Sequence, residues 1–126
     1  MHRHNSILVV EDNDDVSAIL KMRLEAAGYA VAVEQTGSRA CAHLRQDPPA
    51  LVILDVGLPD MDGYAVCKRL RRRYQPEAVP VVMFTIRDEP QDEARGRAAG
   101  ANAYLSKDQD VSVLLRTVDD LLAAPA

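Results

Sequence analysis

The stretch VILDVGLPDMDG, residues 52–63, joins a run of apolar residues to a carboxylate and then to a turn. Val52, Ile53 and Leu54 are typical of a buried strand, because both faces of the run are apolar. Asp55 ends the run, and the glycines and proline that follow it indicate a loop. A buried strand that stops at an acid marks either a turn or a functional site, and the rest of the sequence decides between them.

Similar short apolar runs alternate with helical segments along the chain. We expect five strands, at residues 7–10, 29–33, 51–54, 81–84 and 103–105. After each strand, apolar residues recur every three or four positions, as they do on one face of a helix. Apolar strands separated by helices predict a parallel sheet that is covered by helices on both sides. The expected fold is therefore α/β, a doubly wound five-stranded parallel sheet of the flavodoxin-like (βα)5 type with strand order 2-1-3-4-5.

Length, composition and charge indicate one globular domain. The chain has 126 residues, 48% of them hydrophobic, and a formal net charge of −4. This charge argues against nucleic acid or an anionic membrane as a direct partner. The chain has neither a run long enough to span a bilayer nor a signal peptide, so we expect a cytoplasmic protein. Cys41 and Cys67 are expected to be buried in helices without a disulfide.

Polar residues follow the carboxyl ends of four of the expected strands. Glu11 and Asp12 follow the first strand, Asp55 the third, Thr85 the fourth and Lys107 the fifth. The first and third strands are neighbours in this order, so the three carboxylates are expected to lie a few ångströms apart. Two negative charges about 5 Å apart repel by roughly 3 kcal/mol at an effective dielectric near 20. One lysine does not offset three carboxylates, and oxygen ligands in a half-solvated cleft favour Mg²⁺.

Several of these signals also have a purely structural interpretation. An acid after a strand is commonly a helix cap, and Asp12, Asp14 and Asp15 could all cap the first helix. The basic run KRLRRRY, residues 68–74, is most simply a solvated helix face with its apolar residues turned inward.

The helix expected at residues 90–100 offers little to the core. Its inward residues are expected to be Ala94, Ala98 and Ala99. Gly96 costs it roughly 1 kcal/mol relative to alanine. We therefore expect a loosely held helix beside the fourth strand.

Four motifs of the chain resemble those of the receiver domain of two-component response regulators, the fold of the chemotaxis response regulator. They are VVEDN at 9–13, ILDVGLPDMDG at 53–63, MFT at 83–85 and AYLSK at 103–107. The resemblance covers essentially the whole chain. It implies that residues 1–126 form a single receiver domain with no output domain.

The resemblance implies a chemical role for each acidic residue and for the lysine. Asp55 would be the phosphoacceptor that takes a phosphoryl group from a phosphohistidine, and Lys107 would hold a phosphoryl oxygen. Asp12, Asp55 and the backbone carbonyl of Gly57 would bind Mg²⁺ directly, and Glu11 would act mainly through water. Such a domain assists its own phosphorylation and dephosphorylation but is not a conventional enzyme.

The resemblance also implies a switch and its partners. Thr85 would bind a second phosphoryl oxygen, and Tyr104 would turn inward in response. This change would alter the surface of the fourth helix, the fifth strand and the fifth helix. The implied partners are a sensor histidine kinase or a histidine phosphotransfer protein, a downstream protein target or an output domain, and a second copy in a phosphorylation-linked dimer.

Three other classes of protein share part of this pattern. A haloacid dehalogenase-like phosphatase would need a second Asp two positions after Asp55, where Gly57 stands. A flavodoxin-like nucleotide binder would need a glycine-rich loop where the acidic run EDNDD, residues 11–15, stands. A degenerate receiver that acts by docking alone stays open, because the chain departs from the family pattern at some positions.

These departures lie close to the expected site. Asp108 follows Lys107 where a proline in a cis bond is usual, and Ile86 follows Thr85 where a small residue is usual. Gly57 lacks the side chain that many relatives project over the site. Since a cis bond without proline costs about 3 kcal/mol, we expect the Lys107–Asp108 peptide bond to be trans.

Overall fold

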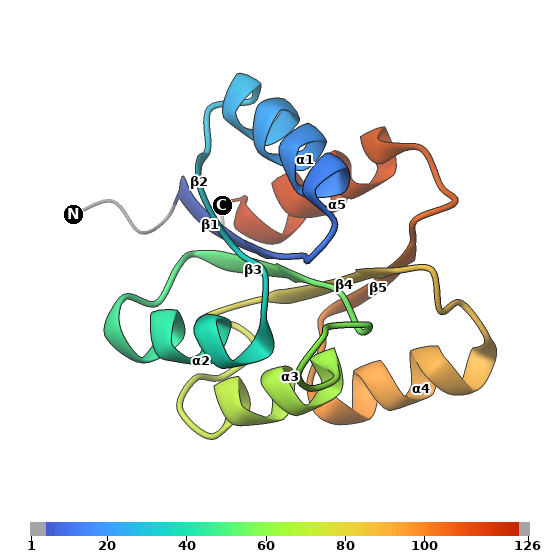
Figure 1. The fold of residues 1–126 in the computed structure, drawn as a ribbon. Coiled ribbons are helices and arrows are strands. Elements are labelled where there is room, and N and C mark those ends of the chain that lie inside the picture. Colours follow the sequence, from blue (N-terminus) through green and yellow to red (C-terminus); the bar gives the residue numbers. More distant parts are fainter. Residues whose placement is uncertain (1–4, 124–126) are drawn as a thin grey trace.

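Five parallel strands form a single sheet in the predicted order, β2-β1-β3-β4-β5. The computed structural model of the chain describes residues 5–123. The strands are β1 (Ser6–Val10), β2 (Ala30–Glu34), β3 (Leu51–Leu54), β4 (Val81–Thr85) and β5 (Ala103–Ser106). The helices that follow them are α1 (Asp14–Ala26), α2 (Gly37–Gln46), α3 (Gly63–Arg71), α4 (Pro90–Ala99) and α5 (Val111–Leu122). This arrangement confirms the doubly wound fold (Figure 1).

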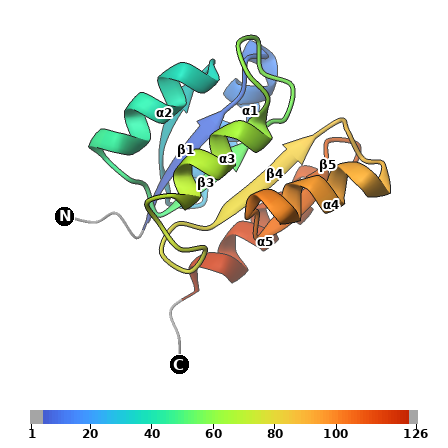
Figure 2. The same cartoon turned by 90° about the horizontal axis from the view of Figure 1, so that it is seen from below.

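Helices cover both faces of the sheet, because its strands are apolar on both sides. The helices α1 and α5 lie on one face and α2, α3 and α4 on the other (Figures 1 and 2). Along β1, Leu8 and Val10 belong to the core beneath α2 and α3, whereas Ile7 and Val9 belong to the core beneath α1 and α5. All four side chains are at most 1% exposed. The alternation of side chains along a strand thus supplies two separate cores.

Helix α1 begins at a residue that was not among the predicted caps. The side chain of Asn13 accepts a hydrogen bond from the Val16 N–H and is the N-cap. Asp14 and Asp15 lie within the first turn, where negative charge is favourable to the helix dipole. Asp12 precedes the cap, so the prediction that Asp12, Asp14 and Asp15 cap the helix is wrong. The Asp12 carboxylate is therefore not needed to begin the helix.

Helix α4 meets the sheet through a different set of residues from the one predicted. Gly96 and Ala99 are buried, whereas Ala94 and Ala98 are exposed. The prediction is therefore confirmed for Ala99 and wrong for the other two alanines. The reason is the ring of Tyr104, because a Cβ on Gly96 would lie 2.6 Å from its Cδ2 atom. The helix turns its glycine, and not an alanine, toward this ring.

Other predictions about the interior are confirmed. Cys41 and Cys67 are buried and free. Leu70 is buried, and Tyr74 packs against the same core, so the basic run on α3 does turn its apolar side inward. Within the described residues, no helix combines the length and the apolar character that crossing a membrane requires.

Candidate functional site

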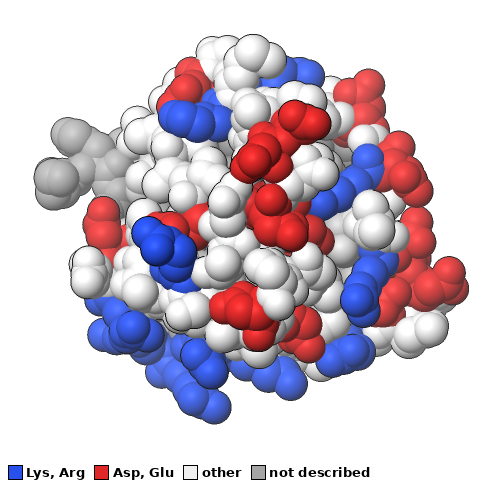
Figure 3. Space-filling view, viewed as in Figure 1, with Lys and Arg blue, Asp and Glu red and all other residues white. Residues whose placement is uncertain are grey.

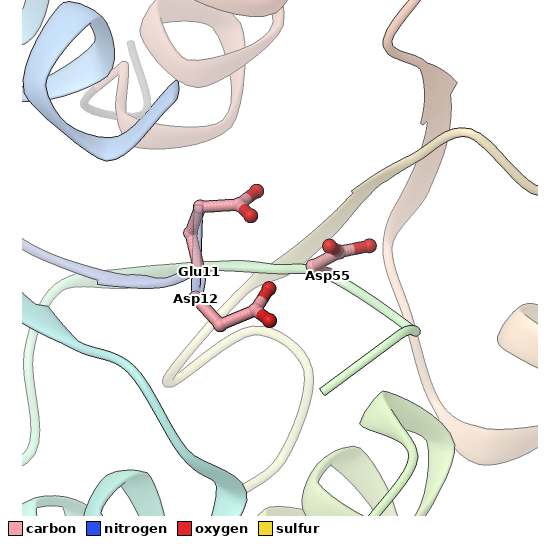
Figure 4. Close-up of side chains that lie close together, drawn as sticks. All are labelled: Glu11, Asp12 and Asp55. Atoms are coloured by element: carbon pink, nitrogen blue, oxygen red, sulfur yellow. The ribbon is translucent and has the colours of Figure 1, made fainter. Parts of the chain in front are cut away.

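Three carboxylates meet at the carboxyl edge of the sheet, as the strand order predicted. Glu11 and Asp12 follow β1, and Asp55 follows β3, which pairs with β1 so that Val10 lies beside Leu54. One oxygen atom from each carboxylate lies within 4.8 Å of those of the other two (Figure 4). Glu11 is 2% exposed and Asp55 is 7% exposed, whereas Asp12 is exposed. The cluster is therefore buried on one side and open to solvent at Asp12.

Lys107 supplies the positive charge of the site. Its Nζ lies 2.7 Å from Glu11 Oε1 and donates a hydrogen bond to Asp55 Oδ2 at 3.0 Å. Its backbone N–H donates to the carbonyl of Thr85 at 2.9 Å, which joins the lysine loop to β4. The described part of the chain contains no cis peptide bond, so the bond between Lys107 and Asp108 is trans, as predicted. The sequence analysis did not foresee the direct contact between Lys107 and Glu11.

Burial and ion pairing shift the pKa values of Glu11 and Lys107 in opposite directions. Burial raises the pKa of Glu11, and the neighbouring Asp55 carboxylate adds to this effect, although the hydrogen bond from Lys107 works against it. Burial by itself lowers the pKa of Lys107, but the hydrogen bonds to Glu11 and Asp55 outweigh burial and raise it. The lysine is therefore held in its charged form by the two carboxylates.

The charge balance of the cluster favours a bound cation. Three carboxylates and one ammonium sum to two uncompensated negative charges. Among the described residues, no basic side chain comes within 4.0 Å of the Asp12 carboxylate. Carboxylate oxygens are the hard ligands that Mg²⁺ prefers, and Mg²⁺ usually keeps several waters beside one or two carboxylates. The residues present fit Mg²⁺, and Asp12 lies on the open side of the cluster, where water would reach a bound ion.

The loop between β3 and α3 fixes the position of Asp55. Gly63 approaches the Asp55 backbone so closely that a Cβ on Gly63 would lie 2.3 Å from the Asp55 carbonyl oxygen. The Gly63 N–H donates to the carbonyl of Val56 at 2.9 Å. The Gly57 N–H donates to Asp55 Oδ1 at 3.3 Å, whereas a Cβ on Gly57 would meet nothing within 4 Å. Glycine is therefore required sterically at position 63 and not at position 57, and the metal contact of the Gly57 carbonyl stays a prediction.

Asp60, which the sequence analysis missed, ties the same loop to α2. Its carboxylate oxygens accept hydrogen bonds from the backbone N–H groups of Gly37, at 2.8 Å, and Ser38, at 2.9 Å. These two hydrogen bonds lower the pKa of Asp60. In the sequence, an aspartate directly after Pro59 looks like an ordinary turn residue, and no local signal reveals its partners on α2.

Thr85 ends β4 at the same edge of the sheet. It is 0% exposed, and its Oγ1 accepts a hydrogen bond from the Arg87 N–H at 3.3 Å. Ile86, the next residue, is 72% exposed. Because β4 pairs directly with β3, Thr85 lies one strand away from Asp55. Its contact with a phosphoryl group stays a prediction.

Tyr104 is linked both to Tyr64 and to the loop after β4. Its hydroxyl donates to the carbonyl of Arg87 at 2.7 Å and lies 3.2 Å from the hydroxyl of Tyr64. Tyr64, 2% exposed at the start of α3, also donates to the carbonyl of Asp92 at 3.1 Å. The two hydroxyl groups have two protons for three contacts. A hydroxyl that loses its carbonyl acceptor is therefore free to donate to the other hydroxyl. Burial, followed by the hydrogen bond with Tyr64, raises the pKa of Tyr104. The sequence analysis missed Tyr64, because an apolar-face tyrosine is usually a core residue.

Comparisons with known proteins show the family of the chain. Residues 7–119 match the family described as response regulator receiver domain. RpaA of Synechocystis sp., a DNA-binding dual master transcriptional regulator, is 39% identical over 116 residues, which are 92% of this chain and 48% of RpaA. PilH of Pseudomonas aeruginosa is 32% identical over 117 residues, which are 93% of this chain and 97% of PilH. The chain therefore spans about half the length of RpaA and nearly all of PilH.

Solved structures give the same result. The BeF3-activated N-terminal receiver domain of RstA from Klebsiella pneumoniae superimposes with a TM-score of 0.88 at 32% identity, covering 95% of this chain and 100% of that domain. The receiver domain of a signal transduction histidine kinase from Syntrophus aciditrophicus gives a TM-score of 0.83 at 36% identity, covering 94% of this chain and 90% of that domain. With its sheet order, its carboxyl-edge acids and these relatives, the chain belongs to the response regulator receiver domains, the phosphoacceptor domains of two-component systems.

Proposed function

We propose that Asp55 is the residue that accepts the phosphoryl group. One observation carries this proposal: the Asp55 carboxylate lies at the carboxyl edge, 3.0 Å from Lys107 Nζ, with oxygens of Glu11 and Asp12 within 4.8 Å. An Asp55 oxygen attacks the phosphorus of a phosphohistidine. The new O–P bond forms, the P–N bond breaks, and the imidazole nitrogen keeps the electron pair. The product is an acyl phosphate on Asp55.

Lys107 and Thr85 supply positive charge and a donor to the phosphoryl oxygens. Lys107 already lies against the Asp55 carboxylate, so it needs only a small movement to contact an oxygen of the incoming group. The Thr85 hydroxyl supplies a second donor. Its present contact with the Arg87 N–H is long, at 3.3 Å, so little is lost when the hydroxyl turns. Catalysis of this kind is mainly positioning and charge stabilisation.

Asp12, Asp55 and the Gly57 carbonyl are the groups that would hold Mg²⁺, with Glu11 acting through water. Bound there, the ion neutralises charge on phosphoryl oxygens in the transition state. Asp12 fits this role because its carboxylate is exposed and has no basic partner among the described residues. Glu11 fits an indirect role because it is occupied by Lys107 at 2.7 Å.

The contacts of Thr85 suggest how the phosphoryl group alters the surface of α4, β5 and α5. Thr85 is joined to Arg87 by a hydrogen bond, and the carbonyl of Arg87 is the acceptor for the Tyr104 hydroxyl. A movement of Thr85 toward the phosphoryl group therefore releases the Arg87 N–H and frees the residue whose carbonyl holds Tyr104. The changed surface is where a downstream protein, an output domain or a second copy binds.

The phosphoryl donor is a sensor histidine kinase or a histidine phosphotransfer protein in the cytoplasm. Among the described residues, the exposed large apolar side chains are Ile19 and Met22 on α1 and Ile86 after β4. Ile19 also lines a hollow of about 130 Å³ together with Lys107 and Val111. Ile19 and Met22 lie one helical turn apart on α1 and form a small apolar patch, which supports a protein contact there. These two residues support a donor that docks over α1, beside the lysine of the site.

Intact-mass spectrometry after treatment with acetyl phosphate and Mg²⁺ tests the acceptor. We expect the chain to gain one phosphoryl group, and we expect Asp55→Asn, or the chain in EDTA, to gain none. Asp120→Asn on α5 is the matched control, because this exposed carboxylate lies on another element, and it should react like the unmodified chain. Phosphorylation of Asp55→Asn at the normal rate would overturn the assignment. A relative was captured in a BeF3-activated state, and this mimic provides the stable form for later measurements.

A further inference from the structure

We propose that the groove between the C-terminal halves of α2 and α3 is a docking site for an acidic protein segment that inserts one apolar side chain. This site is separate from the phosphoacceptor. In a parallel sheet of this kind the helices run back against the strands. The C-terminal halves of α2 and α3 therefore lie toward the amino edge of the sheet, away from Asp55.

The floor of the groove is apolar. Leu44, Leu70 and Cys41 are 4%, 3% and 6% exposed, and Tyr74 packs partly buried beside them. The hollow above them has a volume of about 190 Å³. Pockets for small molecules and cofactors begin at roughly 300 Å³. The groove is thus too small for a cofactor and suits a single apolar side chain.

The rim of the groove is strongly basic and unpaired. Four exposed arginines surround the floor: Arg45, Arg69, Arg72 and Arg73. Among the described residues, no carboxylate comes within 4.0 Å of these four guanidinium groups, whereas Arg95 and Arg97 do have carboxylate partners. Figure 3 shows Lys and Arg side chains gathered along the lower edge of the molecule, on the side of α2 and α3. This edge is positive although the whole chain carries a net charge of −4.

Helix dipoles explain only part of this pattern. Cations near the last turn of a helix are stabilised by the dipole. At the end of α3, however, the structural role belongs to Arg71, which donates to the carbonyls of Gly100 at 2.8 Å and Val79 at 2.9 Å. The other arginines of this turn make no such contacts and face the groove. Their arrangement around an apolar floor is what a complementary acidic partner requires.

An acidic protein segment fits the groove better than other polyanions. A nucleic acid or a lipid surface would meet the arginines through phosphates and leave the apolar floor unfilled. The net negative charge of the chain also opposes an extended polyanion. Because charges are screened over about 8 Å at physiological salt, a short segment experiences mainly the local arginines. The preferred occupant is therefore a short helix or strand with Asp or Glu flanking one Leu, Ile or Phe.

Fluorescence anisotropy with a designed peptide tests the proposal. The probe is a fluorescein-labelled peptide of Glu and Ala with one central Leu, and its partner is a peptide with Ser in place of that Leu. We expect the Leu peptide to bind and the Ser peptide to bind about tenfold more weakly. Arg69→Glu combined with Arg73→Glu should weaken the Leu peptide at least about tenfold. Arg116→Glu is the matched charge control. This exposed arginine is on α5, which covers the opposite face of the sheet, so the substitution should leave binding unchanged.

A second pair of substitutions guards against a misfolded variant. Arg45→Gln combined with Arg72→Gln changes the other half of the rim and should weaken binding in the same direction. Absence of binding, equal weakening by Arg116→Glu, or indifference to the central Leu would overturn the proposal. Tighter binding of a DNA duplex or of phosphatidylglycerol vesicles would assign the groove to those partners instead. Self-association of the chain that disappears in the Arg69→Glu, Arg73→Glu variant would assign it to a second copy.

Discussion

The ring of Tyr104 on β5 lies directly against the backbone of Gly96 on α4. A Cβ on Gly96 would be 2.6 Å from Cδ2 and 2.8 Å from Cε2 of this ring, closer than real Cβ contacts. Glycine is therefore required here by the approach of a helix to an aromatic side chain. The position that looked weak in the sequence is the one that makes room for Tyr104.

We predict that Gly96→Ala displaces Tyr104 and destabilises the chain by about 1 to 3 kcal/mol, the usual cost of overpacking. In an unobstructed helix the same substitution would add about 1 kcal/mol of stability. Urea unfolding measures the difference, and NMR chemical shifts of Tyr104 report its displacement. Gly57→Ala is the control, since a Cβ there meets nothing within 4 Å, and it should change stability by less than about 0.5 kcal/mol. A Gly96→Ala chain that is more stable and leaves Tyr104 in place would contradict the prediction.

Arg71 joins the end of α3 to the loops that precede β4 and β5. It donates to the carbonyls of Val79 and Gly100 and, at 2.9 Å, to the side-chain oxygen of Asn102. Burial lowers the pKa of Arg71. Arg71→Lys keeps a charge but lacks the planar fork, so we predict a loss of about 2 kcal/mol in the free energy of unfolding. Thermal and urea unfolding measure this loss, and the exposed neighbour Arg72→Lys should be nearly neutral. If the two substitutions lowered the free energy of unfolding equally, the planar guanidinium group of Arg71 would not be the source of the stability.

Asp60 should make the stability of the chain depend on acid pH. Its hydrogen bonds to α2 hold its pKa below the ordinary value of 3.8 in the folded state. A depressed carboxyl pKa adds stability above the unfolded pKa, near 3.9, and this stability is lost as the pH falls through the folded value. We predict that Asp60→Asn lowers the urea midpoint of unfolding at pH 7. The difference between the urea midpoints at pH 7 and pH 3 should therefore become smaller. Asp120→Asn, an exposed carboxylate on α5, should leave that difference unchanged. If Asp60→Asn left the difference in urea midpoint unchanged, Asp60 would not contribute to the loss of stability in acid.

Thr85 is expected to connect phosphorylation to the surface of α4, β5 and α5. We predict that Thr85→Ala still accepts a phosphoryl group on Asp55 but loses the response. A charge-assisted hydrogen bond that exists only in the active form biases the equilibrium by about 1 to 3 kcal/mol, and alanine removes it. Amide hydrogen exchange with and without BeF3 measures the response, and Thr85→Ser, which keeps the hydroxyl, should retain it. If the exchange changes were concentrated on α1 and α2, the response would not pass to α4, β5 and α5. If they persisted in Thr85→Ala, the response would not depend on the Thr85 hydroxyl.

The sequence by itself determined the sheet and the meeting of the charged residues. Apolar runs separated by helical periods allow few arrangements other than the doubly wound sheet. In that sheet Glu11, Asp12, Asp55 and Lys107 all follow carboxyl ends of strands. Their convergence is a consequence of strand direction and order, which local patterns encode.

Only the tertiary structure decided which residues fill the shared spaces and partner the polar groups. Asp60 accepts from Gly37 and Ser38, more than twenty positions earlier in the chain. Arg71 reaches Gly100, and Gly96 gives its space to Tyr104. These contacts depend on how closely elements that are remote in sequence approach one another. Local periodicity predicts which face of a helix is buried, but only packing determines which side chain it meets there.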